Sequence, residues 1–431
     1  MRRNLLPVMA LLLSTLFLFL GNGLHGLLLP VRGSAEGYSN EILGLLGTSW
    51  ATGFVAGCLI APKLVMRVGH VRAFSSFISL IAIIALLSGI LVDQYWWVGL
   101  RAVTGFCIAG TSMIIESWLN ERATNESRGT IFSFYISVTL IGVVGGQMLV
   151  GIVDPSTTIL FMVCGILYCL ATLPTTVSTA ATPQPLTSVR LNLPRLYHNS
   201  PVSFVGILMI GIANGAYGTL AAVFGSRAGM APNVIAIMLS VTIFVGAIIQ
   251  FPAGKASDRI DRRFVLAALS ALAALAAIVL IILQPHDPMT MIILVAVYGA
   301  AANALYPIAV AHANDFASAD EFVQVSGGLL LLYGIGTIIG PTIGGPVMTL
   351  FGPHALFAVT AMAHVLLTGY AIYRTRLRAA IPADERENVP NMPVSASPMS
   401  TPESLSLDPR SAPLPEQDDS EIPEQPAGAT S

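Results

Sequence analysis

Arg101 is the only charged residue that lies well inside one of the long apolar stretches of this sequence. A cation without a counter-ion costs several kcal/mol in lipid, so Arg101 is expected to face the protein interior and to find a partner there. Residues at helical spacing extend a semi-polar stripe from it, namely Thr104, Ile108, Thr111, Ser112 and Glu116. One cation beside mostly apolar and amide surroundings is compatible with binding an amphiphilic or anionic solute.

Titratable groups also lie at the ends of two apolar stretches. Glu116 is at the end of the stretch that contains Arg101, and Asp315 follows a later stretch, with His312 one turn before it. Histidine is the side chain whose charge changes most readily near neutral pH. No Asp or Glu lies at mid-depth in any stretch, so Glu116, Asp315 or a histidine would have to carry protons in a proton-driven process. Structural pairing at the membrane surface is the alternative for each of them.

The sequence contains no motif typical of a membrane enzyme or an ATP-driven pump. It has no HExxH zinc motif, no GxSxG nucleophile elbow and no Walker A loop. The four cysteines lie in apolar stretches without a CxxC pair or a nearby histidine cluster. We therefore expect no catalysis, no cofactor, no metal ion and no nucleic-acid partner.

Twelve apolar stretches, each long enough to cross a bilayer, must position these residues. A hydrocarbon core about 30 Å thick needs roughly 20 residues of helix, and a backbone inside lipid has to satisfy its own hydrogen bonds, which favours helices. Only 10% of the residues are charged, against about 25% in soluble domains. The expected spans lie near 5–28, 42–62, 73–92, 95–117, 129–151, 157–176, 201–223, 232–253, 264–283, 288–313, 322–350 and 353–373.

The placement of basic residues predicts the orientation. Nearly all of the 21 Lys and Arg residues lie beside the termini or after even-numbered spans, and only Arg32 and Arg227 lie in the opposite set of connections. By the positive-inside rule both termini are cytoplasmic in a multi-pass protein of the inner membrane. The first twenty residues also fit a signal peptide, but no small-residue cleavage pattern follows, so we expect an uncleaved first span.

The chain divides into two similar halves. The glycine frame GVVGGQMLVG at 142–151 returns as GTIIGPTIGG at 336–345, and NERA at 120–123 returns as NDFA at 314–317. A six-span duplication of unchanged polarity is a parallel repeat, with a substrate site between the halves. We expect bundles at 1–176 and 201–378, a cytoplasmic linker at 177–200, and a disordered cytoplasmic tail at 379–431, which is rich in Pro, Ser and Glu.

Several motifs in matching spans resemble those of the major facilitator superfamily. They are GKASDRIDRR at 254–263, PKLVMRVGHVR at 62–72, RAVTG at 101–105 and GTIIGPTIGG at 336–345. The chain departs from the family pattern at Asp261, where a glycine is usual, at Met66, where an Asp is usual, and at Gln147, where a proline is usual. Three further strings resemble the YcaD-like branch: ESWLNERA at 116–123, YPIAVAHAND at 306–315 and SGGLLLLYGIGTIIGP at 326–341.

This resemblance implies an all-α integral membrane protein with twelve transmembrane helices in two six-helix bundles, the major facilitator fold. It also implies a secondary transporter that moves a small solute by alternating access, as a monomer in the lipid bilayer. Proton-coupled efflux, facilitated transport and uptake all stay open, and the long tail is the one feature that favours a membrane sensor or scaffold instead.

The resemblance places the central cavity among spans 1, 4, 7 and 10. The candidate lining or coupling residues are Asn22, His25, Arg101, Glu116, Asn214, Tyr217, Tyr298, Asn303 and Tyr306. Interhelical hydrogen bonding is the alternative role of these amides and tyrosines. The candidate gating residues are Arg128, Asp258, Arg259, Gly340, Pro341 and Asp315. We expect Asp258 to face the N-terminus of span 5 near Arg128, where the helix dipole and the cation would stabilise its carboxylate.

Overall fold

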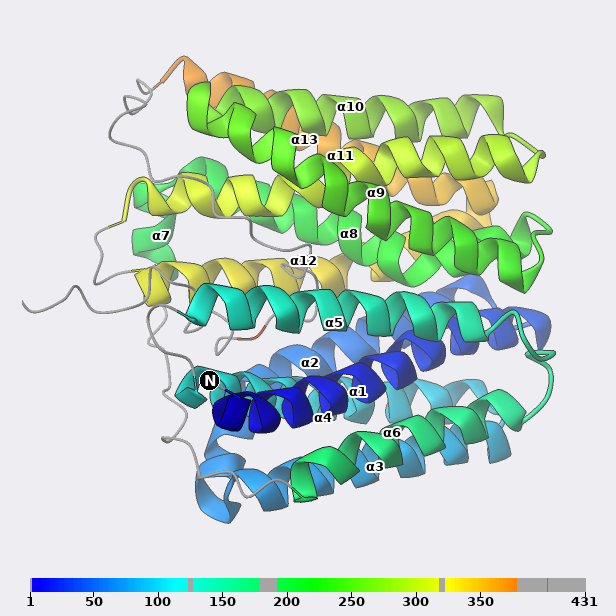
Figure 1. The fold of residues 1–431 in the computed structure, drawn as a ribbon. Coiled ribbons are helices and arrows are strands. Elements are labelled where there is room, and N and C mark those ends of the chain that lie inside the picture. The colour runs from blue at the N-terminus through cyan, green and yellow to red at the C-terminus, as the bar shows by residue number, and fades with distance from the viewer. Residues whose placement is uncertain (1, 123–126, 178–191, 318–321, 378–400, 402–431) are drawn as a thin grey trace, which may run out of the picture.

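The structure, a computed structural model, describes the chain except residues 1, 123–126, 178–191, 318–321, 378–400 and 402–431. The described residues form helices and connections without a strand, and the long helices assemble into two bundles that lie side by side (Figure 1). The N-terminal bundle contains α1 (Arg2–Ala35), α2 (Asn40–Val68), α3 (His70–Ile90), α4 (Gln94–Arg122), α5 (Arg128–Leu149) and α6 (Ile159–Val177). The C-terminal bundle contains α8 (Pro201–Arg227), α9 (Pro232–Arg259), α10 (Arg262–Leu283), α11 (Pro288–Asn314), α12 (Phe322–Phe351) and α13 (Leu356–Thr375).

Two short helices complete the described fold. The first, α7 (Leu193–Asn199), lies within the segment predicted as a linker, and η2 (Pro353–Ala355) precedes α13. The remainder of that predicted linker falls largely outside the described residues. The predicted disorder of the tail also concerns residues outside them, apart from Thr401, which is buried.

Local sequence signals start and end the helices. Ser39 caps α2 by accepting a hydrogen bond from the Ile42 N–H, and Asp287 caps α11 through the Thr290 N–H. The chain leaves α2 at Gly69, whose φ of 88° suits glycine because it has no Cβ. These short connections make the helices that they join antiparallel.

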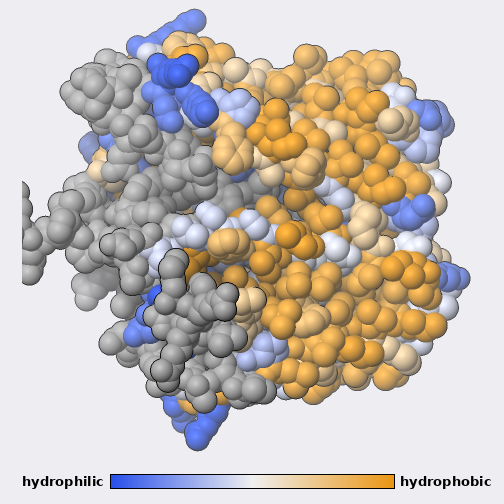
Figure 2. All heavy atoms as spheres, viewed as in Figure 1, coloured by the Kyte–Doolittle hydropathy of each residue, from blue (hydrophilic) through white to orange (hydrophobic). Residues whose placement is uncertain are grey.

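The helices are long and apolar enough for a bilayer. Eleven of those described qualify by length and composition, while the described part of α6, Ile159–Thr175, is shorter. Their outward faces carry large exposed hydrophobic residues such as Phe244, Leu275 and Met362. Figure 2 shows a broad hydrophobic surface over both bundles, with hydrophilic residues gathered towards its edges. Such a belt is the surface that lipid covers, and the protein is a multi-pass membrane protein.

The repeated glycine frame has the same packing role in both bundles. In the N-terminal bundle Gly142 of α5 packs against α1, where an added Cβ would lie 2.8 Å from the Phe19 Cβ. In the C-terminal bundle the corresponding Gly336 of α12 packs against α8, where a Cβ would lie 2.6 Å from the Leu208 carbonyl oxygen. Glycine at these places lets two helix backbones approach closely. The internal repeat seen in the sequence therefore corresponds to an equivalent helix pair in each bundle.

The two ends of the molecule differ. One end carries α7 and the connections rich in Lys and Arg, and we call it the basic end; the other carries the connections 36–39, 150–158, 228–231 and 284–287, and we call it the opposite end. At the opposite end hydrogen bonds join the bundles. Ser226 donates to Ser34 at 2.9 Å, and the Arg227 guanidinium donates to the Tyr38 carbonyl at 2.5 Å and to Asn40 Oδ1 at 3.3 Å.

Helix α2 of the N-terminal bundle and α12 of the C-terminal bundle pack against each other between the opposite end and the middle of the molecule. The Thr48 and Thr342 hydroxyls are 2.9 Å apart, and the Gly44 and Gly345 backbones lie directly against the facing helix. Small residues on both sides make this a close crossing. The bundles are thus in contact at the opposite end in the conformation described here.

Candidate functional site

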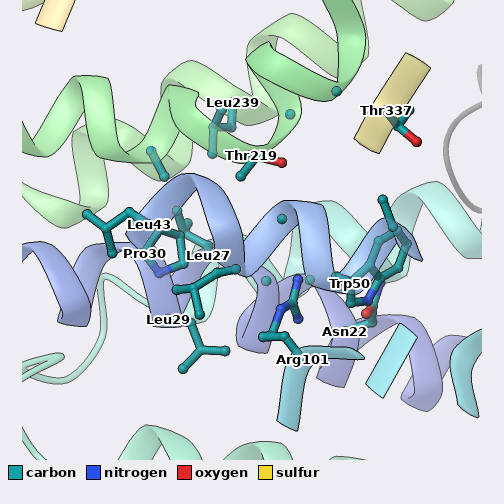
Figure 3. Close-up of a pocket in the computed structure, with 18 of the residues that line it drawn as sticks. Asn22, Leu27, Leu29, Pro30, Leu43, Trp50, Arg101, Thr219, Leu239 and Thr337 are labelled. Carbon is teal, nitrogen blue, oxygen red and sulfur yellow. The ribbon is translucent and has the colours of Figure 1, made fainter. Parts of the chain in front are cut away.

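A cavity of about 190 Å³ lies between the two bundles. It offers room for about six waters at roughly 30 Å³ each. Helices α1, α2, α4 and α5 form one wall, and α8, α9 and α12 form the other. Figure 3 shows Arg101 and Trp50 on the first wall, with Thr219, Leu239 and Thr337 across from them. The lining is mostly apolar, and its other polar side chains are Asn22, Gln147 and Asn214.

Arg101 meets an aromatic ring rather than a carboxylate. Its Cζ lies 5.8 Å from the centroid of the Trp50 ring, within the range of a cation–π contact. Its Nη1 is buried and has no hydrogen-bond partner among the described residues, and the same holds for Trp50 Nε1. The expected polar partner of Arg101 is therefore not supplied by the described part of the chain.

The predicted residues Asn22 and Asn214 also line the cavity. Asn214 donates from Nδ2 to the Tyr333 hydroxyl at 3.3 Å, which directs its amide within the C-terminal bundle. Gln147 of α5 accepts from the Ser240 hydroxyl at 3.3 Å, a hydrogen bond that crosses between the bundles. The sequence singled out Gln147 only as a departure from a proline motif, and that polar substitution was the available signal for its place in the cavity.

Pro341 removes a backbone hydrogen bond from α12, in the cavity wall that the C-terminal bundle forms. A proline has no N–H, so Pro341 cannot donate to the Thr337 carbonyl one turn earlier, and that carbonyl loses its α-helical donor. Thr337 itself lines the cavity. The Pro341 carbonyl faces the other bundle, where a Cβ on Gly44 would lie 2.7 Å from it, while the neighbouring Gly340 packs against the α8 backbone at Ile212. The predicted pair Gly340 and Pro341 thus lies where α12 contacts both bundles.

His25 lies inside the N-terminal bundle, outside the cavity lining. It is fully buried, and its ring stands edge-on to Phe161 and Tyr168 at centroid distances of 6.4 and 6.5 Å. Neither ring nitrogen has a hydrogen-bond partner among the described residues. His25 therefore belongs to a buried aromatic cluster beside the cavity.

Four predicted residues of the C-terminal bundle make contacts between helices instead of lining the cavity. Tyr217 and Thr242 share a hydrogen bond of 3.0 Å between α8 and α9, and Asn303 donates to the Thr242 carbonyl at 3.3 Å. Tyr298 is buried, with its ring centroid 5.2 Å from that of Tyr217. Tyr306 is also buried, and its ring meets Tyr333 of α12 at 5.0 Å.

Glu116 is buried in α4, towards the basic end and away from the cavity lining. The Tyr135 hydroxyl of α5 donates to its Oε1 at 2.9 Å. The Thr401 hydroxyl donates to its Oε2, so a residue of the predicted tail reaches this carboxylate. Glu116 thus joins α4 to α5 and to Thr401 through hydrogen bonds from two hydroxyls.

Asp315 and Asp258 meet at Arg262, a residue that the sequence reasoning did not single out. Arg262 is 1% exposed and binds Asp315 through two hydrogen bonds, Nε to Oδ2 at 2.7 Å and Nη2 to Oδ1 at 3.2 Å. Its Nη1 also reaches Asp258 Oδ1 at 3.2 Å. Asp258 and Arg262 lie only four residues apart, across the turn between α9 and α10, and this short separation was a usable signal. The predicted contact of Asp258 with Arg128 stays a prediction, because the Arg128 side chain lies outside the described residues.

The remaining groups of this loop have separate roles. Arg259 is exposed at the end of α9. Asp261 caps α10 by accepting from the Arg263 N–H at 3.0 Å, and it pairs with the Arg263 guanidinium. Burial raises the pKa of Asp261, but the hydrogen bonds from Arg263 outweigh it and hold that pKa below its usual value. Asp261, which replaces the usual glycine of the motif, therefore stabilises the start of α10.

Two like-oriented helix bundles around a central cavity define the architecture of a membrane transporter. The sequence pattern of the Major Facilitator Superfamily matches residues 11–230 and 200–410. The chain belongs to this superfamily, as its motifs predicted.

Relatives cover most of the chain. An uncharacterised transporter of the major facilitator type from Yersinia pestis (strain Pestoides F) is 28% identical over 357 residues, which are 82% of this chain and 92% of the relative. The uncharacterised transporter YcaD of Escherichia fergusonii is 27% identical over 364 residues, with the same coverage. The predicted resemblance to the YcaD-like branch is confirmed.

Solved structures share the fold. The nucleoside transporter NupG aligns with a TM-score of 0.70 at 14% identity, over 86% of this chain and 100% of its own. A bacterial homologue of the human lysosomal transporter Spinster aligns with a TM-score of 0.69 at 16% identity, over 88% of this chain and 97% of its own. At such identities the likeness establishes the major facilitator fold alone.

Proposed function

We propose that this protein is a secondary transporter that moves a small solute by alternating access, with the cavity at Arg101 as the solute site. One observation carries the proposal: the cavity lies between the bundles, and Arg101 projects to it from a transmembrane helix without a protein acceptor for its Nη1 among the described residues. A buried cation is costly unless it has a function or a partner, so a polar solute is a reason to keep it there.

The two bundles are the moving units in this proposal, with boundaries at 1–176 and 201–378 and the segment 177–200 between them. The positive-inside rule makes the basic end cytoplasmic and places both termini in the cytoplasm. The contacts of Arg227 and Thr48 then close the outer side, so this conformation would exchange solute with the cytoplasm. Cysteine labelling that found the two termini on opposite sides of the membrane would contradict this orientation.

Glu116 is the group that we propose for proton coupling. It is a buried carboxylate on the same helix as Arg101, and it accepts hydrogen bonds from the hydroxyls of Tyr135 and Thr401. Protonation and deprotonation of Glu116 would alter these hydrogen bonds and so bias the packing of α4 against α5. Facilitated transport without protons is the alternative, and it predicts no response to a pH gradient.

A solute screen in proteoliposomes tests the proposal. Purified full-length protein is reconstituted, and radiolabelled small solutes are followed with and without an imposed pH gradient of either direction. Solute movement that saturates and falls at least about tenfold in Arg101→Gln would support the solute site. A gradient response that disappears in Glu116→Gln would support coupling. If solutes move at the same rate in Arg101→Gln as in the unaltered protein, the cavity is not the solute site.

A further inference from the structure

Two N–H donors on one wall of the cavity have no acceptor. Arg101 Nη1 and Trp50 Nε1 are both buried and both without a hydrogen-bond partner among the described residues. Buried N–H groups in proteins are normally paired, and an unpaired one lowers stability, most of all when it is charged. Both side chains line the same cavity, so a ligand that enters it can bring an acceptor to these donors once the side chains turn towards it.

The charge at the cavity is positive and is not balanced by its described lining. None of the described lining residues is acidic, and the Arg101 guanidinium lies over the Trp50 ring. Two further arginines, at the opposite end of the molecule, already have partners. Arg32 pairs with Glu36, and Arg227 donates hydrogen bonds to Tyr38 and Asn40. Arg101 is therefore the described cation that remains available to an anionic ligand.

The rest of the cavity sets the shape and polarity of such a ligand. The wall facing Arg101 is neutral, with Thr219, Leu239 and Thr337 (Figure 3), and further leucines line the cavity from α1 and α2. A volume of about 190 Å³ suits a small molecule rather than a peptide or a lipid. The guanidinium is planar and matches the two oxygens of a carboxylate better than a single neutral acceptor.

We propose that the cavity binds a small organic monoanion, whose carboxylate accepts hydrogen bonds from Arg101 and Trp50 while its apolar body lies against the leucines. The proposal rests on the proposed function, because it names the class of solute for the same cavity. Arg101 supplies charge and two-point geometry, and Trp50 supplies one further donor together with the face on which the guanidinium rests.

The test compares probes that share a body and differ in charge. Benzoate, benzamide and benzylamine form one set, and hexanoate, hexanamide and hexylamine form a second. Binding to the purified full-length protein is measured by the rise in melting temperature and by isothermal titration. The variants are Arg101→Gln, Arg101→Lys and Trp50→Phe, which keeps an aromatic ring but removes the indole N–H. Arg72→Gln, at an exposed arginine in the first turn of α3, is the matched control.

We expect the carboxylates to stabilise the protein and the amides and amines not to. The affinity for benzoate or hexanoate should fall at least about tenfold in Arg101→Gln, less in Arg101→Lys and about threefold to tenfold in Trp50→Phe, with no change in Arg72→Gln. Melting curves of the ligand-free variants show whether each one folds, and Trp50→Phe tests the site even if an Arg101 variant does not.

Two results overturn the inference. One is binding of the neutral or cationic probes that equals or exceeds that of the carboxylates, and the other is the absence of stabilisation by either carboxylate. Failure of the proposed function looks different, because it would appear in the flux screen as no saturable movement of any solute, whatever its charge. A neutral solute that moves in an Arg101-dependent manner would leave the transporter proposal standing and remove only the monoanion.

Discussion

Replacing Gly345 with alanine should shift the balance between the two ends of the transporter. Gly345 belongs to α12, and the atoms nearest to an added Cβ are all in the other bundle, at Asn40 and Glu41 of α2. Nothing inside its own bundle comes as close. The added methyl group therefore penalises contact between the bundles at the opposite end and leaves the packing within each bundle unchanged.

The size of the effect follows from the distances. The Cβ would lie 2.7 Å from the Asn40 carbonyl oxygen and 2.9 Å from the Glu41 Cα. Carbon atoms in contact prefer about 3.5–4.0 Å, so the helices would have to separate by roughly 0.6–0.8 Å. Overpacking of this kind costs about 1–3 kcal/mol. That free energy corresponds to a shift of roughly 5-fold to 150-fold in the equilibrium, away from the conformation described here.

Distances between spin labels measure this shift directly. Labels at Ser156→Cys and His286→Cys report the separation of the bundles at the opposite end, in a background without the four native cysteines. We expect Gly345→Ala to populate a longer distance. Gly44→Ala, whose Cβ would lie 2.7 Å from the Pro341 carbonyl oxygen, should act in the same direction. Gly369→Ala, which meets nothing within 4 Å, controls for the helix propensity of alanine.

An unchanged distance distribution in both Gly345→Ala and Gly44→Ala would refute this reasoning. It would mean that the crossing of α2 and α12 does not limit the conformational change, or that the two helices yield without cost. A change in Gly369→Ala of the same size would show that propensity, not the contact, is responsible.

Three further predictions concern the basic end and the tail. Asp315→Asn should lower the free energy of unfolding by about 3–5 kcal/mol, because it breaks a buried pair with Arg262. Asp258→Asn should lower it by under about 1 kcal/mol, because that carboxylate is partly exposed. Denaturant titration in mixed micelles compares the two variants, and equal losses would contradict the stronger role of Asp315. The pKa of Asp261 in the folded protein lies below its value in the unfolded chain. The stability that Asp261 contributes should therefore be present above about pH 4 and be lost as the pH falls through the folded pKa. The melting temperatures of the unaltered protein and Asp261→Asn should differ at neutral pH and converge in acid. Deletion of 379–431 removes Thr401 from Glu116 but removes no described cavity-lining residue. Saturable solute movement without a pH gradient should therefore persist, and a deletion that abolished it in a folded protein would favour a sensor or scaffold.

The class of fold could be predicted from the sequence because lipid leaves few choices. The spans followed from apolar length, and the two bundles followed from the repeated glycine frame, whose members Gly142 and Gly336 pack against equivalent helices. Arg101 could be predicted as a site residue because a cation exposed to lipid is energetically unfavourable, so one inside an apolar stretch must face the interior. The structure confirms the fold, and it places Arg101, Asn22 and Asn214 together.

The faces of the helices were harder to predict. Trp50 and Gln147 line the cavity because of how α2 and α5 dock against the other bundle, which spacing within one helix does not reveal. Conversely, Tyr217, Tyr298 and Asn303 are polar residues on suitable helices, but their hydrogen bonds and ring contacts are made within the C-terminal bundle. A polar side chain in a membrane helix has either role, and only the packing decides between them.

The contact at the opposite end is made of groups that water can also satisfy. The hydroxyls of Ser34, Ser226, Thr48 and Thr342 and the carbonyl of Tyr38 are neutral, and the Arg227 guanidinium that donates to this carbonyl is exposed to solvent. Each hydrogen bond among such groups contributes only about 1 kcal/mol net, since hydration replaces it once the surfaces separate. A vestibule on that side could therefore fill with water at little energetic cost, so that thermal fluctuations suffice to expose the cavity to either compartment.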